Sequence, residues 1–117
     1  MKDTRTPQTV LETKEYIKQA EACMDTGART DFIDYIARNP LAGDLIPNTG
    51  GARKIRWVKE GHQGKRGGVR IIYYYYNQDV PIFLFSVYSK NQKANMTDKE
   101  CKILYTIIQD IKLLYGG

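Results

Sequence analysis

Basic residues are concentrated in one stretch of the sequence, from Ala52 to Arg70. The stretch holds seven Lys and Arg side chains against one acid, whereas bases and acids are nearly balanced in the rest of the chain. The seven bases are Arg53, Lys54, Arg56, Lys59, Lys65, Arg66 and Arg70. Such a cluster is typical of a surface that binds a polyanion, because contacts to phosphates release counterions. The alternative is a solvated charged face.

These residue types can support the cleavage of RNA. In this reaction a 2′-hydroxyl attacks the adjacent phosphate, which requires a base, an acid for the leaving oxygen, and cations for the added charge. The candidate catalytic residues are Lys54, Arg56, Arg70 and Lys90. Guanidinium groups stay protonated, so proton transfer falls to Lys54 or to His62, which is otherwise a plain surface histidine. Crowding by other cations lowers the pKa of a lysine.

Other side chains near the basic stretch can contact RNA. Tyr88 can stack on a base or donate a hydrogen bond to a phosphate, although its ring can equally cap the edge of the core. The predicted RNA-binding residues are Trp57, His62, Lys65, Arg66, Tyr88 and Asn91. The four consecutive tyrosines from Tyr73 to Tyr76 suit a strand, and at least two of them should be core residues.

The sequence predicts no metal site and no cofactor. Cys23 and Cys101 lack a metal-like spacing and are expected to be buried free thiols, and one histidine cannot form a His/Cys cluster. No acidic cluster suggests a magnesium site. Charged residues occur throughout the first twenty positions, and no apolar run approaches the length of a membrane span. We therefore expect a cytoplasmic protein that does not contact the membrane.

The elements that position these residues follow from hydrophobic periodicity. The whole chain, residues 1–117, is expected to form one α+β domain whose helices cover an antiparallel sheet. In the N-terminal part we expect a loose arm over 1–7, an edge strand over 8–12, and helices over 14–24 and 31–39. A loop over 39–51 then leads to strands over 52–58, 69–76 and 81–88, and the first two of these strands are joined by a basic hairpin loop over 60–68. The last helix is expected to start at a capping box of Thr97 and Glu100.

Alternation along the predicted strands assigns the cations to one face of the sheet. In the first long strand, Lys54 and Arg56 share one face and Ile55 and Trp57 share the other. Residues two apart on a strand are roughly 7 Å apart. Arg70 is the second residue of the predicted strand over 69–76 and shares a face with Ile72, Tyr74 and Tyr76, so the sequence predicts a sheet face that carries several cations.

Two long segments resemble the RelE/HigB superfamily of bacterial toxins, and its HigB-like branch in particular. They are FIDYIARNPLAGDLIPNTGGARKIRW and GKRGGVRIIYYYY, supported by FLFSVYSKN and the MTDKE start of the last helix. The resemblance extends over residues 10–115. It implies a compact α+β domain in which a twisted antiparallel sheet is flanked by two N-terminal helices and one C-terminal helix.

The resemblance also implies a toxin of a toxin-antitoxin system: a metal-independent mRNA endoribonuclease (mRNA interferase) that cuts translated messages in the ribosomal A site. By motif position, Lys54 and Arg56 are the paired basic residues, with Lys54 the possible base. Arg70 is the phosphate-binding arginine, and Lys90 stabilises the reacting phosphate or the leaving group. The implied partners are the ribosome, mRNA and a cognate antitoxin of the helix-turn-helix DNA-binding type.

Two departures from the family pattern affect the site. Met96 stands where some RelE members have a tyrosine, and the histidines and aspartate of other HigB members have no match after Tyr88. Base stacking by the missing tyrosine would pass to Trp57 or Tyr88. With so few acid-base groups, positioning of the message by the ribosome would supply much of the rate. The alternative is a non-catalytic RNA- or ribosome-binding protein that blocks translation without cleavage.

Overall fold

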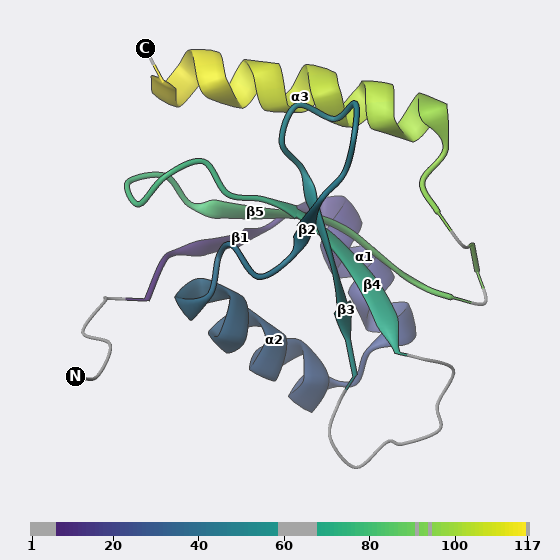
Figure 1. The fold of residues 1–117 in the computed structure, drawn as a ribbon. Coiled ribbons are helices and arrows are strands. Elements are labelled where there is room, and N and C mark those ends of the chain that lie inside the picture. Colours follow the sequence, from purple (N-terminus) through teal and green to yellow (C-terminus); the bar gives the residue numbers. More distant parts are fainter. Residues whose placement is uncertain (1–6, 59–67, 91, 94, 117) are drawn as a thin grey trace.

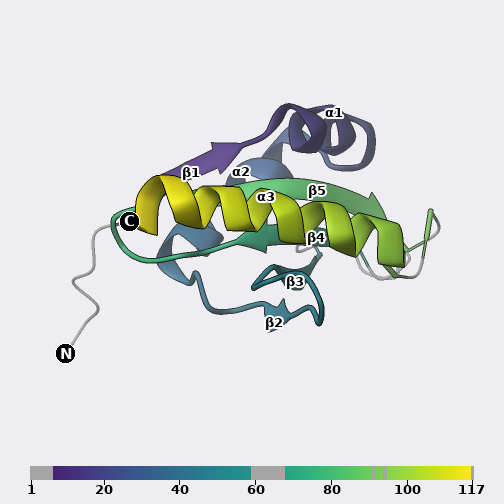
Figure 2. The same ribbon diagram turned by 90° about the horizontal axis from the view of Figure 1, so that it is seen from above.

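A five-stranded sheet with helices on both faces forms the centre of the molecule, as the computed structural model shows (Figure 1). The structure describes residues 7–58, 68–90, 92–93 and 95–116. Two helices lie on one face and the C-terminal helix lies across the other (Figure 2). The predicted loose arm falls outside the described residues except for Pro7. No helix in the described part of the chain is long and apolar enough to cross a membrane.

The strands are arranged in the order β1-β5-β4-β3-β2. Their bounds are Val10–Glu12 for β1, Asp44–Leu45 for β2, Arg53–Trp57 for β3, Val69–Tyr74 for β4 and Ile82–Ser89 for β5. β1 pairs with β5 in parallel, and the other neighbours are antiparallel. The sheet is therefore mixed, in contrast to the antiparallel sheet that was predicted. The long connection between β1 and β5 permits the parallel pairing.

The two N-terminal helices are α1 (Lys14–Cys23) and α2 (Thr26–Arg38). The side chain of Asp25 accepts a hydrogen bond of 2.7 Å from the Ala28 amide and caps α2. The predicted helix over 31–39 was wrong at its start, because the Asp-Thr-Gly segment caps the helix instead of breaking it.

The C-terminal helix α3 (Asp98–Gly116) begins at the predicted capping box. Thr97 Oγ1 accepts from the Glu100 amide at 3.1 Å, and Glu100 Oε1 accepts from the Thr97 amide at 2.9 Å. These two bonds satisfy amide groups that the first turn of a helix leaves unpaired. The prediction of this helix start is confirmed.

Strand β4 separates two hydrophobic cores. Its odd-numbered residues, such as Ile71 and Tyr73, pack against α1 and α2, whereas Ile72 and Tyr74 pack against α3. Tyr73 and Tyr74 are both buried, which confirms that at least two of the consecutive tyrosines are core residues. The predicted alternation of this strand is confirmed. Arg70 lies on the same face of β4 as Ile72 and Tyr74, which is the face that α3 covers.

The segment before β3 is held in place by one tyrosine and one arginine. The buried Tyr73 hydroxyl accepts from the Gly43 amide and donates to the Pro40 carbonyl, each at 2.8 Å. The Arg53 guanidinium donates to the Gly43 carbonyl at 2.6 Å. These contacts place β2, which lies inside the predicted loop over 39–51, against β3. Because the two residues of β2 lie between turn-forming residues, hydrophobic periodicity did not predict this strand.

The glycine pair before β3 forms the tight turn of this hairpin. Gly50 and Gly51 have φ values of 80° and 128°, a region that residues with a Cβ rarely adopt. Lys112 of α3 donates to the Gly50 carbonyl at 3.2 Å, and the Tyr105 side chain lies next to Gly50. The turn therefore packs on α3 and supports the helix over the sheet.

Candidate functional site

Three residues on adjacent strands form a row on the α3 side of the sheet. Arg56 of β3 lies directly opposite Arg70 of β4, and Arg70 lies directly opposite Tyr88 of β5. Neighbouring strands are about 4.8 Å apart, so the row spans roughly 10 Å of backbone. We call these three residues the arginine row. The register brings two guanidinium groups from different strands to neighbouring positions, which suits the binding of one anion.

The two candidate lysines flank the arginine row. Lys54 lies two residues before Arg56 on the same face of β3, in the position opposite Ile72. Lys90 is exposed and follows Ser89, the last residue of β5, at the end of the sheet that carries the row. All four predicted catalytic residues therefore lie on one face or at one end of three neighbouring strands.

Trp57 lies on the opposite face of the sheet from the arginine row. Its ring centroid is 5.2 Å from that of Phe32 and 5.2 Å from that of Tyr35, and its Nε1 donates to the Ala28 carbonyl at 3.1 Å. The ring thus anchors α2 to β3, and the structure does not bring it together with the cations. The predicted RNA-binding residues His62, Lys65, Arg66 and Asn91 lie outside the described residues.

Tyr88 is the third member of the row and is only 4% exposed. Its hydroxyl group has no hydrogen-bond partner among the described residues. Burial raises the pKa of Tyr88, the positive charge of Arg70 lowers it, and the negative charge of Glu100 raises it further. The hydroxyl is therefore within electrostatic reach of both the arginine row and the start of α3.

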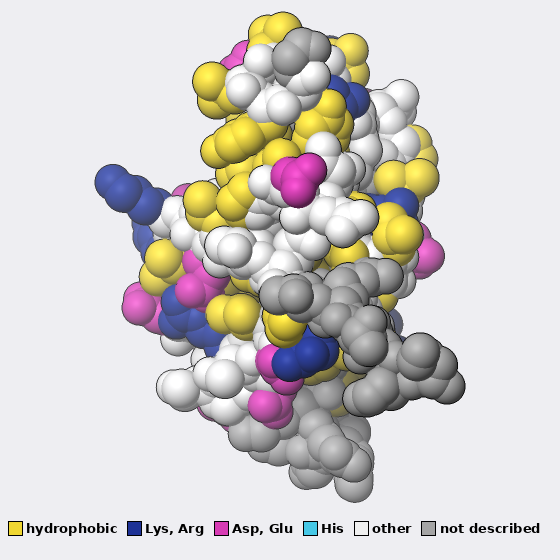
Figure 3. Space-filling model, turned by 90° about the vertical axis from the view of Figure 1, so that its left-hand side faces the viewer, with side chains coloured by type: hydrophobic (Ala, Val, Ile, Leu, Met, Phe, Trp, Pro, Cys, Tyr) yellow, Lys and Arg dark blue, Asp and Glu magenta, His cyan; other side chains and the backbone are white. Residues whose placement is uncertain are grey.

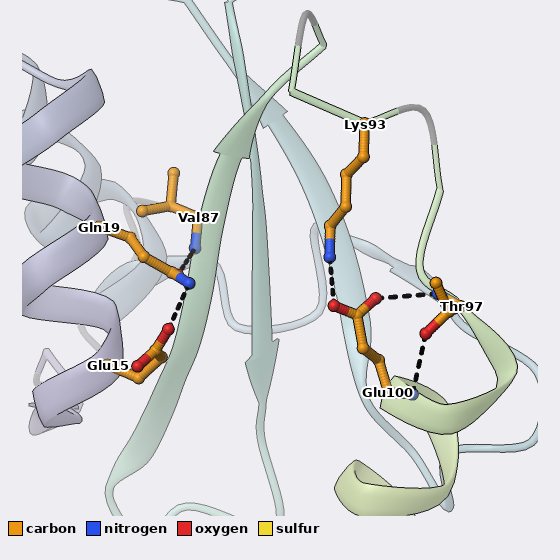
Figure 4. A network of polar contacts seen from close by, with 6 residues as sticks. All are labelled: Glu15, Gln19, Val87, Lys93, Thr97 and Glu100. Atoms are coloured by element: carbon orange, nitrogen blue, oxygen red, sulfur yellow. Dashed lines mark hydrogen bonds and ion pairs between the residues drawn. The ribbon is translucent and has the colours of Figure 1, made fainter.

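The sequence did not single out Lys93, which the structure places beside Tyr88. Figure 4 shows the Lys93 side chain pointing toward the carboxylate of Glu100. The Lys93 Nζ lies 4.8 Å from the centroid of the Tyr88 ring and 2.6 Å from Glu100 Oε2. This ion pair is the main reason why the pKa of Glu100 is lowered. Glu100 was predicted as a capping residue, but no spacing rule pairs it with a lysine from the preceding irregular segment.

A groove of about 490 Å³ opens next to Tyr88, over β5 and between α1 and α3. Its apolar lining consists of Phe85, Met96, Ile103, Leu104 and Ile107. On the α1 side, Gln19 accepts from the Val87 amide at 2.9 Å and donates to Glu15 at 2.6 Å, as Figure 4 shows. Met96, which replaces a family tyrosine in the sequence comparison above, thus faces an apolar groove that begins at the arginine row.

The far end of α3 carries a second kind of surface. Leu113 and Leu114 are 79% and 78% exposed, and Tyr115 is half exposed. Figure 3 shows hydrophobic side chains gathered around this end of the helix. Contiguous exposed apolar side chains are typical of interaction surfaces. This surface is at the opposite end of α3 from Glu100 and the arginine row.

The described residues contain no group of three or more His, Cys, Asp or Glu side chains placed to hold a metal ion. Cys23 and Cys101 are free thiols, but both are partly exposed, whereas the sequence predicted that they would be buried.

The fold is that of a small basic α+β domain, and one face of its sheet carries Lys54, Arg56 and Arg70. The sequence profile of the family described as the RelE toxin of the RelE/RelB toxin-antitoxin system matches residues 11–114. Because the match covers nearly the whole chain, the protein belongs to the RelE toxin family. Membership implies a toxin with a cognate antitoxin as its partner. The expectation of a RelE-superfamily toxin with an α+β fold is confirmed.

Proposed function

We propose that the protein is a cytoplasmic, ribosome-dependent mRNA endoribonuclease that cleaves translated messages in the A site and so inhibits growth. Membership of the RelE toxin family supports a nuclease action linked to translation. The observation that carries the proposal is the register that sets Arg56, Arg70 and Tyr88 side by side. The motifs that include NPLAGDLIPNTGG favour the HigB-like branch and a helix-turn-helix antitoxin.

In this proposal the two arginines of the arginine row bind the phosphate that is attacked. Arg70 lies in the middle of the row, so its guanidinium contacts the phosphate, and Arg56 shares the charge that develops on the equatorial oxygens. Lys54 takes the proton of the 2′-hydroxyl, and Lys90 stabilises the leaving oxygen. The proposed mechanism routes no step through a metal ion.

Dependence on the ribosome follows from the small number of groups available for proton transfer. The arginines cannot act as bases, and in the described part of β3 and β4 Lys54 is the lysine that shares a face with the two arginines. A ribosome that holds the message in the attacking geometry supplies rate through positioning, which can be worth several orders of magnitude. We therefore expect little cleavage of free RNA.

A translation extract with one defined message tests the proposal. Protein treated with EDTA and then dialysed is added, and the 5′ ends of the message are mapped with and without ribosomes. We expect cuts at discrete positions only when ribosomes translate the message. Arrested translation with an intact message would instead establish the alternative, a non-catalytic protein that blocks the ribosome.

The variant Lys54→Arg tests the proposed base. It keeps the positive charge but replaces a group that can lose a proton with one that cannot. We expect cleavage in the extract to fall about 100-fold or more, the typical contribution of a general base. Cleavage at the wild-type rate would restrict Lys54 to an electrostatic role.

A further inference from the structure

The proposed catalytic roles of Lys54, Arg56, Arg70 and Lys90 do not explain the buried hydroxyl of Tyr88. It has no hydrogen-bond partner among the described residues. Buried polar groups in native proteins are nearly always bonded, because an unmade bond is destabilising. A tyrosine that keeps a hydroxyl group without a partner among the described residues, at the end of the arginine row, therefore suits an acceptor that a ligand brings.

Lys93 is the side chain that lies over this tyrosine. Its ammonium group sits 4.8 Å from the ring centroid, and the side chain is 32% exposed. An ammonium group has three donors, and Glu100 accepts from Lys93 at 2.6 Å. Lys93 can therefore donate to a ligand that approaches from solvent.

Glu100 is held in place independently of Lys93. One carboxylate oxygen accepts from the Thr97 amide at 2.9 Å, and the Glu100 amide donates to Thr97 Oγ1 at 3.1 Å. Both bonds belong to the capping box of α3 and persist when the ammonium group turns away. The carboxylate thus holds Lys93 over Tyr88 without depending on it.

Two cationic side chains are neighbours of Tyr88. Arg70 is directly opposite Tyr88 in the sheet, and Lys93 lies over the ring of Tyr88. A ligand acceptor at Tyr88 would therefore lie close to positive charge. A phosphate suits this position because it is an anion with several acceptor oxygens.

We propose that Lys93 and the hydroxyl of Tyr88, the last member of the arginine row, form a further phosphate subsite for single-stranded RNA beside the phosphate that Arg56 and Arg70 bind, and that Glu100 holds the Lys93 ammonium group when no RNA is bound. The choice of RNA as the ligand of this subsite rests on the proposed function. It binds a phosphate next to the one that is cleaved, so Lys93 contributes to binding and placement of the message.

The test is the salt dependence of binding to ribosomes that carry a defined message in the A site. Each phosphate of single-stranded RNA that a protein neutralises adds about 0.7 to the slope of log affinity against log salt. We expect Lys93→Gln to reduce the slope by about 0.7 and to weaken binding about ten- to hundredfold at low salt. Lys93→Arg should restore both. Lys102→Gln, on the exposed side of α3, is the matched control and should leave both unchanged.

Thermal unfolding of each variant shows whether it is folded. A slope and affinity for Lys93→Gln equal to those of Lys102→Gln would overturn the subsite. Binding is measured independently of cleavage, so the two proposals fail separately. If the wild-type protein binds without cutting, the nuclease proposal fails, while the subsite still stands or falls on the slope.

Discussion

The same substitution at two buried tyrosines should change stability in opposite directions. The hydroxyl of Tyr73 makes two hydrogen bonds of 2.8 Å, whereas that of Tyr88 makes none to the described residues. The two side chains are 0% and 4% exposed and lie on neighbouring strands. Tyr73→Phe and Tyr88→Phe each remove one oxygen atom and leave the ring in place, so they form a matched pair.

The magnitudes follow from the bonds that are lost. Tyr73→Phe leaves the Gly43 amide and the Pro40 carbonyl without their partner, and we expect it to lower the free energy of unfolding by about 1–3 kcal/mol. Tyr88→Phe removes a buried group that has no partner in the part of the chain that the structure describes, and we expect it to raise the free energy of unfolding by about 1 kcal/mol or more. For a chain of this length, 1 kcal/mol corresponds to roughly 4 °C in the unfolding midpoint.

Urea unfolding followed by circular dichroism measures both changes, provided that the slope with denaturant stays constant. Tyr88→Phe should also weaken binding to programmed ribosomes, so the variant gains stability and loses function. If Tyr88→Phe proved as destabilising as Tyr73→Phe, the hydroxyl would be bonded in the folded protein, and the reasoning behind the phosphate subsite would be refuted.

Two further predictions concern pH, and one concerns packing. Because Lys93 lowers the pKa of Glu100, the carboxylate stabilises the fold above about pH 4.5 and loses this effect below it. When urea midpoints of unfolding are measured against pH, the midpoint of Glu100→Gln should therefore fall less at acid pH than that of the wild type. Burial raises the pKa of Tyr16 above its ordinary 10.0, so stability should fall as the pH rises above 10, and less so for Tyr16→Phe. Ile108→Ala, at a fully buried site between α3 and the sheet, should cost about 2–5 kcal/mol, whereas Ile103→Ala, at a half-exposed site, should cost far less.

The fold could be predicted well because local patterns and tertiary packing agree. Alternation in β3 and β4 assigned Lys54, Arg56 and Arg70 to one face, and the capping box fixed the start of α3. These signals depend on residues that are close in sequence. The missed elements lack such signals: β2 has only two residues, and its pairing depends on contacts from Tyr73 and Arg53.

The composition of the candidate site was only partly predictable. The sequence placed Arg56 and Arg70 on one face but could not set them opposite each other, because that register depends on how the hairpin between β3 and β4 closes. Trp57 was expected near RNA, yet its own alternation with Lys54 and Arg56 already placed it on the α2 side. Lys93 had no periodic signal, since it lies in an irregular segment before α3.

The proposed function depends on cations from adjacent strands that converge on one phosphate, with Arg70 in the middle. The most direct measurement is the rate at which ribosome-held message is cut by the wild type and by Arg70→Ala, with thermal unfolding of both recorded. We predict that Arg70→Ala keeps its unfolding midpoint within a few degrees of the wild type and loses about 100-fold or more of the cleavage rate. Cleavage by a folded Arg70→Ala at the wild-type rate would contradict the proposed role of the arginine row.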